Sequence, residues 1–361
     1  MDDVDRQHLA RAIAQAETAR ARTAPNPAVG CVIAHGPQVV GVGATRPAGD
    51  AHAEVVALAD AADRAQGATA YVTLAPCTHV GRTGACTDSL AAAGIQRVVI
   101  GLRDPNPVSG DANAALSARG LCVEFAPADG LFAATVRHQL EGFLTAVARG
   151  RPHMTLKLAQ TTAGELVRSG PSRWITGAAA RSAVHRWRAS VDAVAVGVGT
   201  VATDDPQLTA RDGVAQGAHQ PRAVVFDSQL RVPQDATVVR DGTIILTTVS
   251  ASHPAAGLLR DRGLEIARVA PGRDGRVDIG EAVRTLAELG VTTVFAEPGR
   301  RLAQAMVDAD VVDRLVLHIA GDGGDAARPA IVAPACTQIE RLGGAGVDGI
   351  LHHVRPSGVP A

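Results

Sequence analysis

The sequence His52-Ala53-Glu54, followed by Pro76-Cys77 and later by Cys86, brings together residue types that bind a metal ion. Imidazole nitrogen and thiolate sulfur are good zinc ligands, and three protein ligands leave a fourth position open, as in catalytic zinc sites. Water bound in that position becomes a usable nucleophile near neutral pH. Glu54 is not needed as a ligand, so its carboxyl group can transfer protons. The sequence therefore predicts a hydrolytic zinc site with ligands His52, Cys77 and Cys86 and with Glu54 as a catalytic residue.

The order of these residues narrows the chemistry further. H-x-E followed by P-C and a later cysteine is typical of zinc-dependent nucleobase deaminases. The usual gap between the two cysteines is two residues, but here the longer loop 78–85 separates Cys77 from Cys86. His79 lies in this loop, and two interpretations of it stay open, contact with a substrate or exposure to solvent.

The residues around this site predict alternating helices and strands. An Ala-rich segment without Pro or Gly predicts a helix at 5–21, and the prolines in 23–27 end it. Further helices are expected at 53–65 and 87–93, and strands at 28–33, 38–43, 69–74 and 97–101. Strands that alternate with helices indicate a sheet covered on both faces. His52 is thus expected to open one helix, and the cysteine pair to lie where a strand leads into the next.

A second set of elements begins after Arg149-Gly150-Arg151-Pro152, which marks the expected boundary between domains 1–149 and 150–361. A chain of 361 residues also favours two domains over one. Strands are expected at 153–159, 193–198, 222–226, 244–248, 291–296 and 314–319, and helices at 131–148, 177–189, 279–289 and 302–309.

Composition limits the class of protein. Apolar residues make up 46% of the chain, as in globular proteins, and the net charge of -1 gives no general basic field for nucleic acid or membrane. Aromatic residues are 2%, too few for base-stacking surfaces. The five cysteines are scattered and odd in number, which predicts free thiols in a reducing compartment. No signal peptide and no run of ~18 apolar residues is found, so a soluble cytoplasmic enzyme is expected.

Three weaker motifs allow competing interpretations. Gly197-Val198-Gly199-Thr200 lacks the third glycine of a dinucleotide-binding fingerprint, but it fits a tight strand-to-helix turn with backbone donors. Asp204-Asp205-Pro206 is more typical of a turn or a hydroxyl-binding acid than of a metal site. The basic segment Arg181 to Arg188 is either a solvated helix face or a surface that binds an anion.

Longer motifs in the first half are Pro25-Asn26-Pro27-Ala28-Val29-Gly30, His52-Ala53-Glu54-Val55, Pro76-Cys77-Thr78-His79 and Asp104-Pro105-Asn106-Pro107. They resemble those of the bifunctional riboflavin-biosynthesis deaminase–reductase family, RibD or RibG, in which a long gap between the cysteines is typical. The resemblance implies a cytidine-deaminase-like, three-layer α/β/α domain. It also implies zinc-dependent deamination of 2,5-diamino-6-ribosylamino-4(3H)-pyrimidinone 5′-phosphate, with Glu54 moving protons and Asn26 binding substrate.

The second half contains Lys157-Leu158-Ala159, Trp174-Ile175-Thr176, Gly197-Val198-Gly199-Thr200-Val201 and Leu208-Thr209-Ala210-Arg211. These residues resemble the reductase domain of the same family. That resemblance implies a dihydrofolate-reductase-like α/β domain that uses NADPH to reduce the ribosyl group to ribityl. It assigns Lys157 as a catalytic residue, assigns Ser172, Arg188, Leu208, Arg211 and Glu297 to the substrate, and assigns Ala159, Trp174, Thr200, Asp204 and Ser228 to NADPH. Arginine suits a substrate phosphate because its forked donors match the oxygens.

The second half also departs from the family pattern. Ala163 stands where an acidic residue is usual, Pro171 replaces a Glu, Arg300 replaces a Pro, and Gly321 to Asp325 replace an apolar segment. These departures favour an alternative hypothesis, a RibD-like paralogue of a secondary pathway with an active deaminase and a weakened or retuned reductase.

Two other classes of protein are alternatives. A nucleotide-binding or regulatory protein with a dead zinc site is opposed by the complete ligand set and Glu54. A deaminase of nucleic acid is opposed by the neutral charge and scarce aromatic residues. The expected cofactors are Zn2+ and NADPH, and the expected partner is a small pyrimidine nucleotide rather than nucleic acid or membrane. The family resemblance further implies a homo-oligomer, either a dimer or a tetramer.

Overall fold

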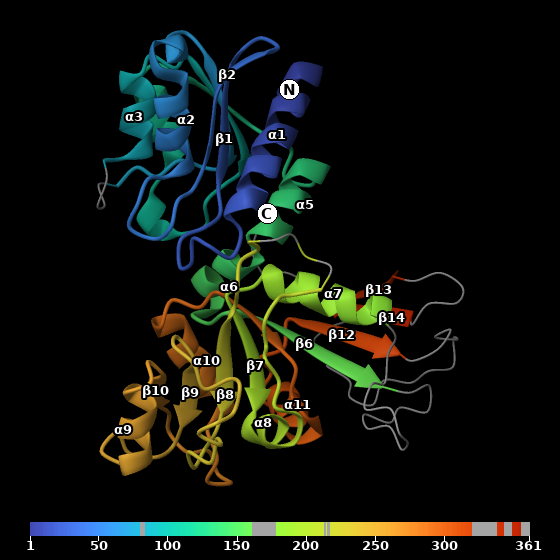
Figure 1. The fold of residues 1–361 in the computed structure, drawn as a ribbon. Coiled ribbons are helices and arrows are strands. Elements are labelled where there is room, and N and C mark those ends of the chain that lie inside the picture. The colour runs from blue at the N-terminus through green and yellow to red at the C-terminus, as the bar shows by residue number, and fades with distance from the viewer. Residues whose placement is uncertain are drawn as a thin grey trace. The chain divides into compact units, whose positions relative to one another are not determined.

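The computed structural model describes residues 1–79, 84–160, 178–212, 214, 217–319, 338–342 and 349–354. The chain divides between Arg149 and Gly150 into two compact units, each built around its own sheet (Figure 1). Among the helices in these ranges, none combines the length and the apolar character that crossing a membrane requires.

The first unit contains a mixed sheet of five strands in the order β2-β1-β3-β4-β5. β1 is antiparallel to β2 and β3, whereas β3, β4 and β5 run parallel. The strands are β1 (Gly30–His35), β2 (Gln38–Ala44), β3 (Thr69–Leu74), β4 (Arg97–Leu102) and β5 (Cys122–Phe125). The helices are α1 (Asp3–Ala19), α2 (Ala53–Ala61), α3 (Cys86–Ala92), α4 (Ala112–Ala118), α5 (Leu131–Gln139) and α6 (Glu141–Arg149), with 3-10 turns η1 (Ala62–Ala65) and η2 (Pro107–Ser109).

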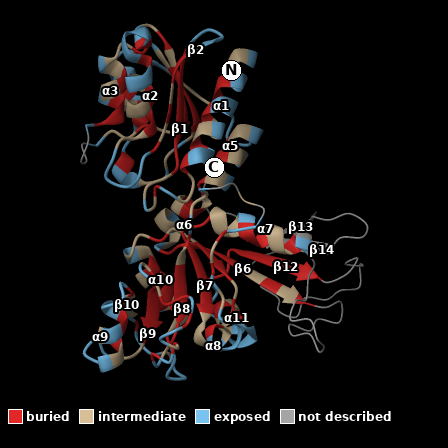
Figure 2. Cartoon of the chain, in the orientation of Figure 1, coloured by how far each residue is buried: buried red, intermediate tan, exposed pale blue. Residues whose placement is uncertain are grey.

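Helices cover both faces of this sheet, with α1 and α5 on one face and α2 and α3 on the other (Figure 1). Side chains along a strand point alternately to the two faces. Val32 and Tyr71 therefore pack with Ala12 of α1, while Ile33 and Val72 belong to the core that includes α2 and α3. The central strands β1, β3 and β4 lie mostly buried between the layers (Figure 2). The expected three-layer α/β/α arrangement is confirmed.

Glycines on the first two strands let the helices approach the sheet closely. A Cβ atom on Gly43 would overlap the carbonyl oxygen of Ala53, and one on Gly41 would overlap that of Ala57. The first turn of α2 therefore lies directly against β2, which fixes the height of His52 and Glu54 above the sheet.

An ion-pair network around the buried Asp5 connects the N-terminal helix to the sheet. The guanidinium group of Arg97 on β4 donates to both carboxylate oxygens of Asp5, at 2.7 and 2.8 Å, and to Glu124 on β5 at 2.9 Å. Tyr71 donates its hydroxyl hydrogen to Asp5 at 3.0 Å. The Arg97 hydrogen bonds hold the pKa of Asp5 far below its ordinary value of 3.8, against the opposing effect of burial.

The second unit contains a nine-stranded sheet in the order β10-β9-β8-β7-β11-β6-β12-β14-β13. The first seven strands of this order run parallel, and β14 and β13 add an antiparallel edge. The strands are β6 (His153–Gln160), β7 (Ala193–Gly197), β8 (Arg222–Phe226), β9 (Ile244–Thr247), β10 (Glu265–Arg268), β11 (Thr293–Ala296), β12 (Arg314–Ile319), β13 (Gln338–Leu342) and β14 (Gly349–Val354). The helices are α7 (Ala178–Ala189), α8 (Val198–Asp204), α9 (Pro254–Arg260), α10 (Ile279–Glu288) and α11 (Arg300–Asp308).

This sheet also has a buried core on each face. Val194 of β7 packs in the cluster that includes Val184 of α7 and Val201 of α8. Ala195, the next residue, packs in the cluster with Leu286 of α10 and Met306 of α11. The unit has the expected dihydrofolate-reductase-like α/β architecture, in which the carboxyl ends of the parallel strands share one edge, as the common strand direction requires.

Most expected elements are observed, with three corrections. The helix expected at 53–65 ends at Ala61, because Ala62 has a positive φ of 50°, and a 3-10 turn follows over Ala62–Ala65. The single helix expected at 131–148 is two helices, because the chain turns at Leu140 between α5 and α6. The strand expected at 193–198 ends at Gly197, where the backbone becomes the N-cap of α8. The strand-to-helix turn at Gly197 is thus confirmed.

Candidate active sites

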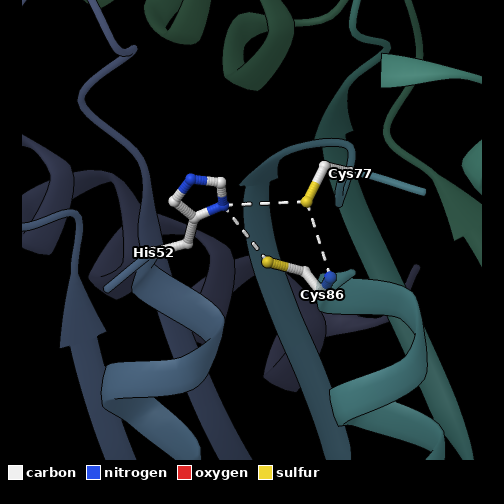
Figure 3. Close-up of side chains that lie close together, drawn as sticks. All are labelled: His52, Cys77 and Cys86. Carbon is white, nitrogen blue, oxygen red and sulfur yellow. Dashed lines mark hydrogen bonds between the residues drawn. The ribbon is translucent and has the colours of Figure 1, made fainter. Parts of the chain in front are cut away.

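The predicted metal ligands come together at the start of two neighbouring helices (Figure 3). His52 is the residue that precedes α2, and Cys86 is the first residue of α3. Cys77 lies in the segment that follows β3, and its sulfur accepts a hydrogen bond from the backbone N–H of Cys86 at 3.4 Å. Neither His52 nor Ala85, the two N-cap residues, makes a side-chain capping hydrogen bond to its helix.

The spacing of the three donor atoms fits zinc. Nδ1 of His52 lies 3.3 Å from the sulfur of Cys86 and 3.7 Å from the sulfur of Cys77. Ordinary zinc–nitrogen and zinc–sulfur bonds in a tetrahedron separate N and S by about 3.6 Å. All three ligand atoms lie within 4.8 Å of one another. One imidazole and two thiolates at these distances form a zinc-binding site, and they leave a fourth position for a reactant.

Glu54 lies beside the ligands in the first turn of α2 and is only 3% exposed. Burial raises the pKa of its carboxyl group to about 7, and the nearby Cys77 thiolate acts in the same direction. A carboxyl group with a pKa near neutrality both accepts and releases protons readily. The hydrogen bonds from Cys86 and His52 lower the pKa of Cys77, against the effect of burial, and this favours the thiolate, the form that binds a metal.

A second loop is joined to the metal-binding loop, and the sequence reasoning gave it no role. Both the backbone N–H and the hydroxyl group of Thr78 donate to the carbonyl oxygen of Ser109, at 3.0 and 2.9 Å. The hydroxyl group of Ser109 donates to Asp104 at 2.6 Å, and the backbone N–H of Asn106 donates to the same carboxylate at 2.8 Å. Ala75, Asp104 and Asn106 line a cavity of about 250 Å³. The signal in the sequence was Asp104-Pro105-Asn106-Pro107, whose prolines and capping Asn form a rigid turn.

Asn26 and His79 are the other predicted residues of the first unit. Asn26 closes a turn before β1, in which its backbone N–H donates to Thr23 and its carbonyl oxygen accepts from the Thr23 hydroxyl group. His79 is exposed in the segment after Cys77. Both interpretations of His79 therefore stay open.

In the second unit, three of the predicted residues form one charged cluster. Lys157 lies on β6, Glu297 directly follows the neighbouring strand β11, and Arg188 lies near the end of α7. Arg188 donates through Nε to Glu297 at 2.7 Å, and both side chains are largely buried. Burial lowers the pKa of Lys157, and the Arg188 charge adds to this effect, whereas Glu297 opposes it.

Two further predicted substrate residues lie next to this cluster. Arg188 also donates to the carbonyl oxygen of Thr209, at 3.1 Å, between Leu208 and Arg211. Leu208 is 1% exposed and has a left-handed backbone, with φ of 53°. The guanidinium group of Arg211 donates to Gln207 and to the Thr209 hydroxyl group, and the residue is exposed.

The predicted cofactor residues lie at several places in the second unit. Thr200, in the first turn of α8, is close to Gly299, where a Cβ atom would be 3.8 Å from the threonine hydroxyl oxygen. The starts of α8 and α11 thus lie together, next to the carboxyl ends of β7 and β11. Helix starts at such a strand edge suit a phosphate group, so these residues fit a nucleotide cofactor.

The remaining residues of this set are more dispersed. Ala159 lies on β6 opposite His318 of β12, and Asp204 is the exposed last residue of α8. Ser228 follows β8 and accepts a hydrogen bond from the backbone of Val277 at 3.1 Å. Ser172 and Trp174 lie outside the described residues. So do the departures Ala163, Pro171 and Gly321 to Asp325, whereas Arg300 opens α11.

Together, the first unit has the fold and ligand set of a zinc-dependent deaminase, and the second is a dihydrofolate-reductase-like domain. Family models agree with this division. The zinc-binding region of cytidine and deoxycytidylate deaminases matches residues 2–102, and the RibD C-terminal domain matches residues 152–324.

Similar proteins extend over most of the chain. The riboflavin biosynthesis protein RibD of Aquifex aeolicus is 36% identical, with 88% of this chain and 87% of that protein covered. RibD of Escherichia coli is 37% identical with the same coverage. A solved structure of Acinetobacter baumannii RibD superimposes with a TM-score of 0.80 at 31% identity, covering 97% of this chain and 98% of that one. A Thermotoga maritima diaminohydroxyphosphoribosylaminopyrimidine deaminase/5-amino-6-(5-phosphoribosylamino)uracil reductase gives a TM-score of 0.79 at 28% identity, covering 98% and 99%.

The chain belongs to the RibD family of bifunctional deaminase–reductases of riboflavin biosynthesis. The expectations of an enzyme with a zinc-binding deaminase domain and a reductase domain are therefore confirmed.

Proposed function

We propose that residues 1–149 deaminate 2,5-diamino-6-ribosylamino-4(3H)-pyrimidinone 5′-phosphate and that residues 150–361 reduce the ribosyl group of the product with NADPH. The observation that carries the first step is the buried Glu54 carboxyl group beside three zinc ligands. The names of the relatives support the substrates, because one solved relative is described as acting on these pyrimidine nucleotides.

In the deaminase site, His52, Cys77 and Cys86 would hold zinc, and the bound ion would supply an activated water molecule for hydrolysis at the amino-bearing ring carbon. Glu54 takes a proton from that water and delivers it to the departing amino group, which leaves as ammonia. Its raised pKa suits this exchange, since the same group must hold and release the proton in one cycle. Asn26 and the loop after Cys77 hold the pyrimidine.

In the reductase site, bound NADPH supplies the hydride that reduces the ribosyl carbon. Lys157 supplies the accompanying proton, which its lowered pKa favours. Arg188 and Arg211 bind the anionic substrate, and Glu297 keeps the Arg188 guanidinium group in place. The residues proposed to bind the cofactor are Ala159, Trp174, Thr200, Asp204 and Ser228. Two further residues, Ser172 and Leu208, are proposed to bind the substrate.

From the family resemblance we further propose a homo-oligomer, either a dimer or a tetramer, and from the scattered free thiols a cytoplasmic location. Sedimentation of the purified zinc-loaded protein would distinguish a dimer from a tetramer and both from a monomer.

The decisive experiment supplies the zinc-loaded protein with the diaminopyrimidine nucleotide, first alone and then with NADPH or NADH. We expect ammonia release in every case, and oxidation of NADPH only after deamination. Ammonia release without oxidation of either cofactor would instead favour the paralogue with a weakened reductase.

A further inference from the structure

The segment 207–211 carries two of the proposed substrate residues, Leu208 and Arg211, but it belongs to no helix or strand. A segment of this kind orders a binding site only if other groups fix its backbone, because each free residue costs about 1–2 kcal/mol of conformational entropy to order. Two side chains that the proposed function does not use, Gln220 and His185, make such contacts.

Gln220 pairs with the segment through both ends of its side-chain amide. Its Oε1 accepts from the backbone N–H of Ala210 at 3.0 Å, and its Nε2 donates to the carbonyl oxygen of Ala210 at 2.9 Å. This paired arrangement reproduces what a neighbouring strand would offer to Ala210. Gln220 itself precedes β8 by one proline, so the strand fixes its position.

His185 holds the following residue from the other side. Nδ1 of His185 lies 3.3 Å from the backbone nitrogen of Arg211 and 3.1 Å from the carbonyl oxygen of Thr209. An unprotonated Nδ1 accepts from the N–H of Arg211, and a protonated Nδ1 donates to the carbonyl oxygen of Thr209, so either tautomer of the ring bonds to the segment. Arg188 also donates to the Thr209 carbonyl oxygen.

The surroundings of the His185 ring favour its neutral form over the charged one. The residue is 6% exposed, and its burial, together with the Arg188 and Arg211 charges, lowers its pKa, against the effects of Thr209 and Asp212. The left-handed Leu208 is anchored in the core with Val184, one residue before His185 on α7. The segment is therefore fixed at three successive points.

We propose that Gln220 and His185 are positioning residues that set the backbone of the segment 207–211 and thereby the place of Arg211 against the nucleotide substrate. This inference rests on the proposed function, because it assumes that Leu208 and Arg211 line the substrate. Neither side chain touches the substrate in this assignment, so their effect appears in substrate binding and leaves hydride transfer itself intact.

The test uses full-length zinc-loaded protein and the variants Gln220→Ala, His185→Phe and His185→Asn. Asn places an oxygen where Nδ1 of the histidine accepts its hydrogen bond, and Phe removes the acceptor while filling the space. The matched control is Gln304→Ala, which removes an exposed glutamine that bonds only to Asp308 among the hydrogen bonds described on α11.

We expect Gln220→Ala and His185→Phe to raise the KM for the deaminated nucleotide about three- to tenfold, as the loss of one or two hydrogen bonds implies. The kcat of NADPH oxidation and the dissociation constant of NADPH should stay within twofold of the wild type, and His185→Asn and Gln304→Ala should keep the wild-type KM. An unchanged KM in both damaging variants would overturn the proposal. Loss of NADPH binding in parallel with substrate binding would also overturn it, since it would indicate general damage to the unit.

The deaminase reaction separates this inference from the proposed function. If the wild type releases ammonia but does not oxidise NADPH, the proposed reductase function fails and the positioning role fails with it. If the wild type oxidises NADPH and the variants match it, only the positioning role is refuted.

Discussion

The two sites of the chain are built in opposite ways. The zinc ligands lie within a short stretch, from His52 to Cys86, and two adjacent helix starts bring them together. The reductase cluster collects Lys157, Arg188 and Glu297 from separate elements across most of the second unit. When the residues of a site are close in the chain, their types and spacing indicate its chemistry from the sequence alone. When the fold brings together residues from distant elements, the site can be recognised only in the structure.

The largest expected effect tests whether the zinc site works independently of the reductase site. Cys77→Ala removes one of three ligands, so we expect the loss of bound zinc and of ammonia release. Reduction of the already deaminated nucleotide should continue, because no element of the second unit contributes a ligand among the described residues. Zinc per chain, measured by elemental analysis, and the two separate assays check this. Cys122→Ala is the control, since that exposed thiol lies outside the ligand group.

Glu54→Gln sharpens the comparison by separating metal binding from proton transfer. The amide keeps the shape of the side chain but cannot carry the proton, so we expect ammonia release to fall by roughly 10²- to 10⁴-fold with zinc still bound. Near-wild-type turnover in a zinc-replete variant would contradict the role of Glu54.

A single substitution in the reductase site should reduce its activity less than the loss of a zinc ligand reduces deamination, because several residues bind the substrate there. Arg188→Ala removes hydrogen bonds to Glu297 and Thr209 and leaves a buried carboxylate without its charged partner. Loss of charged hydrogen bonds of this kind costs about 1.5–3 kcal/mol, so we expect kcat/KM for NADPH oxidation to fall about ten- to a hundredfold. Ammonia release should not change. Arg186→Ala, an exposed arginine of the same helix, should leave both steps intact.

The smallest expected effect concerns acid stability in the first unit. The pKa of Asp5 is depressed in the folded chain, mainly by Arg97, so its stabilising contribution is complete above the ordinary value of 3.8 and is lost as the pH falls below it. By pH 3 this one group should reduce the free energy of unfolding by about 1 kcal/mol relative to pH 6. Urea unfolding at both pH values should show a smaller difference in Asp5→Asn. The exposed Asp3→Asn should show the wild-type difference.

Much of the first site could be predicted because its determinants are close in sequence. A strand, a Pro-Cys pair, the loop 78–85 and a helix start follow in this order, so the placement of Cys77 and Cys86 follows from the element order. The interruption of the helix at Leu140 was not predicted, and the local signal for it is Gly142, which weakens a helix but does not by itself end one. The bond from Thr78 to Ser109 joins two loops and is invisible until the parallel strands β3 and β4 are paired.

The second site shows where sequence reasoning ends. Arg188 was one of several arginines on a basic helix, with a solvated face as the competing interpretation, and only the fold selects it by placing it against Glu297. Leu208 was assigned to the substrate, but its left-handed backbone and buried side chain follow from contacts with residues far along the chain. No periodicity could show that Gln220 would pair with Ala210, because that pairing depends on where β8 begins.

The uncapped starts of α2 and α3 have a consequence for the protein before it acquires its metal. The side chains of His52 and Ala85 make no capping hydrogen bond, and the one side-chain acceptor described for these first turns is the sulfur of Cys77, itself a metal ligand. A cation held by His52, Cys77 and Cys86 would join the two helix starts. Chelation should therefore speed the hydrogen exchange of the first-turn amides while amides in β3 stay protected. The ion that activates the reactant would then also stabilise the first turns of α2 and α3, and these two turns would become more rigid when it binds.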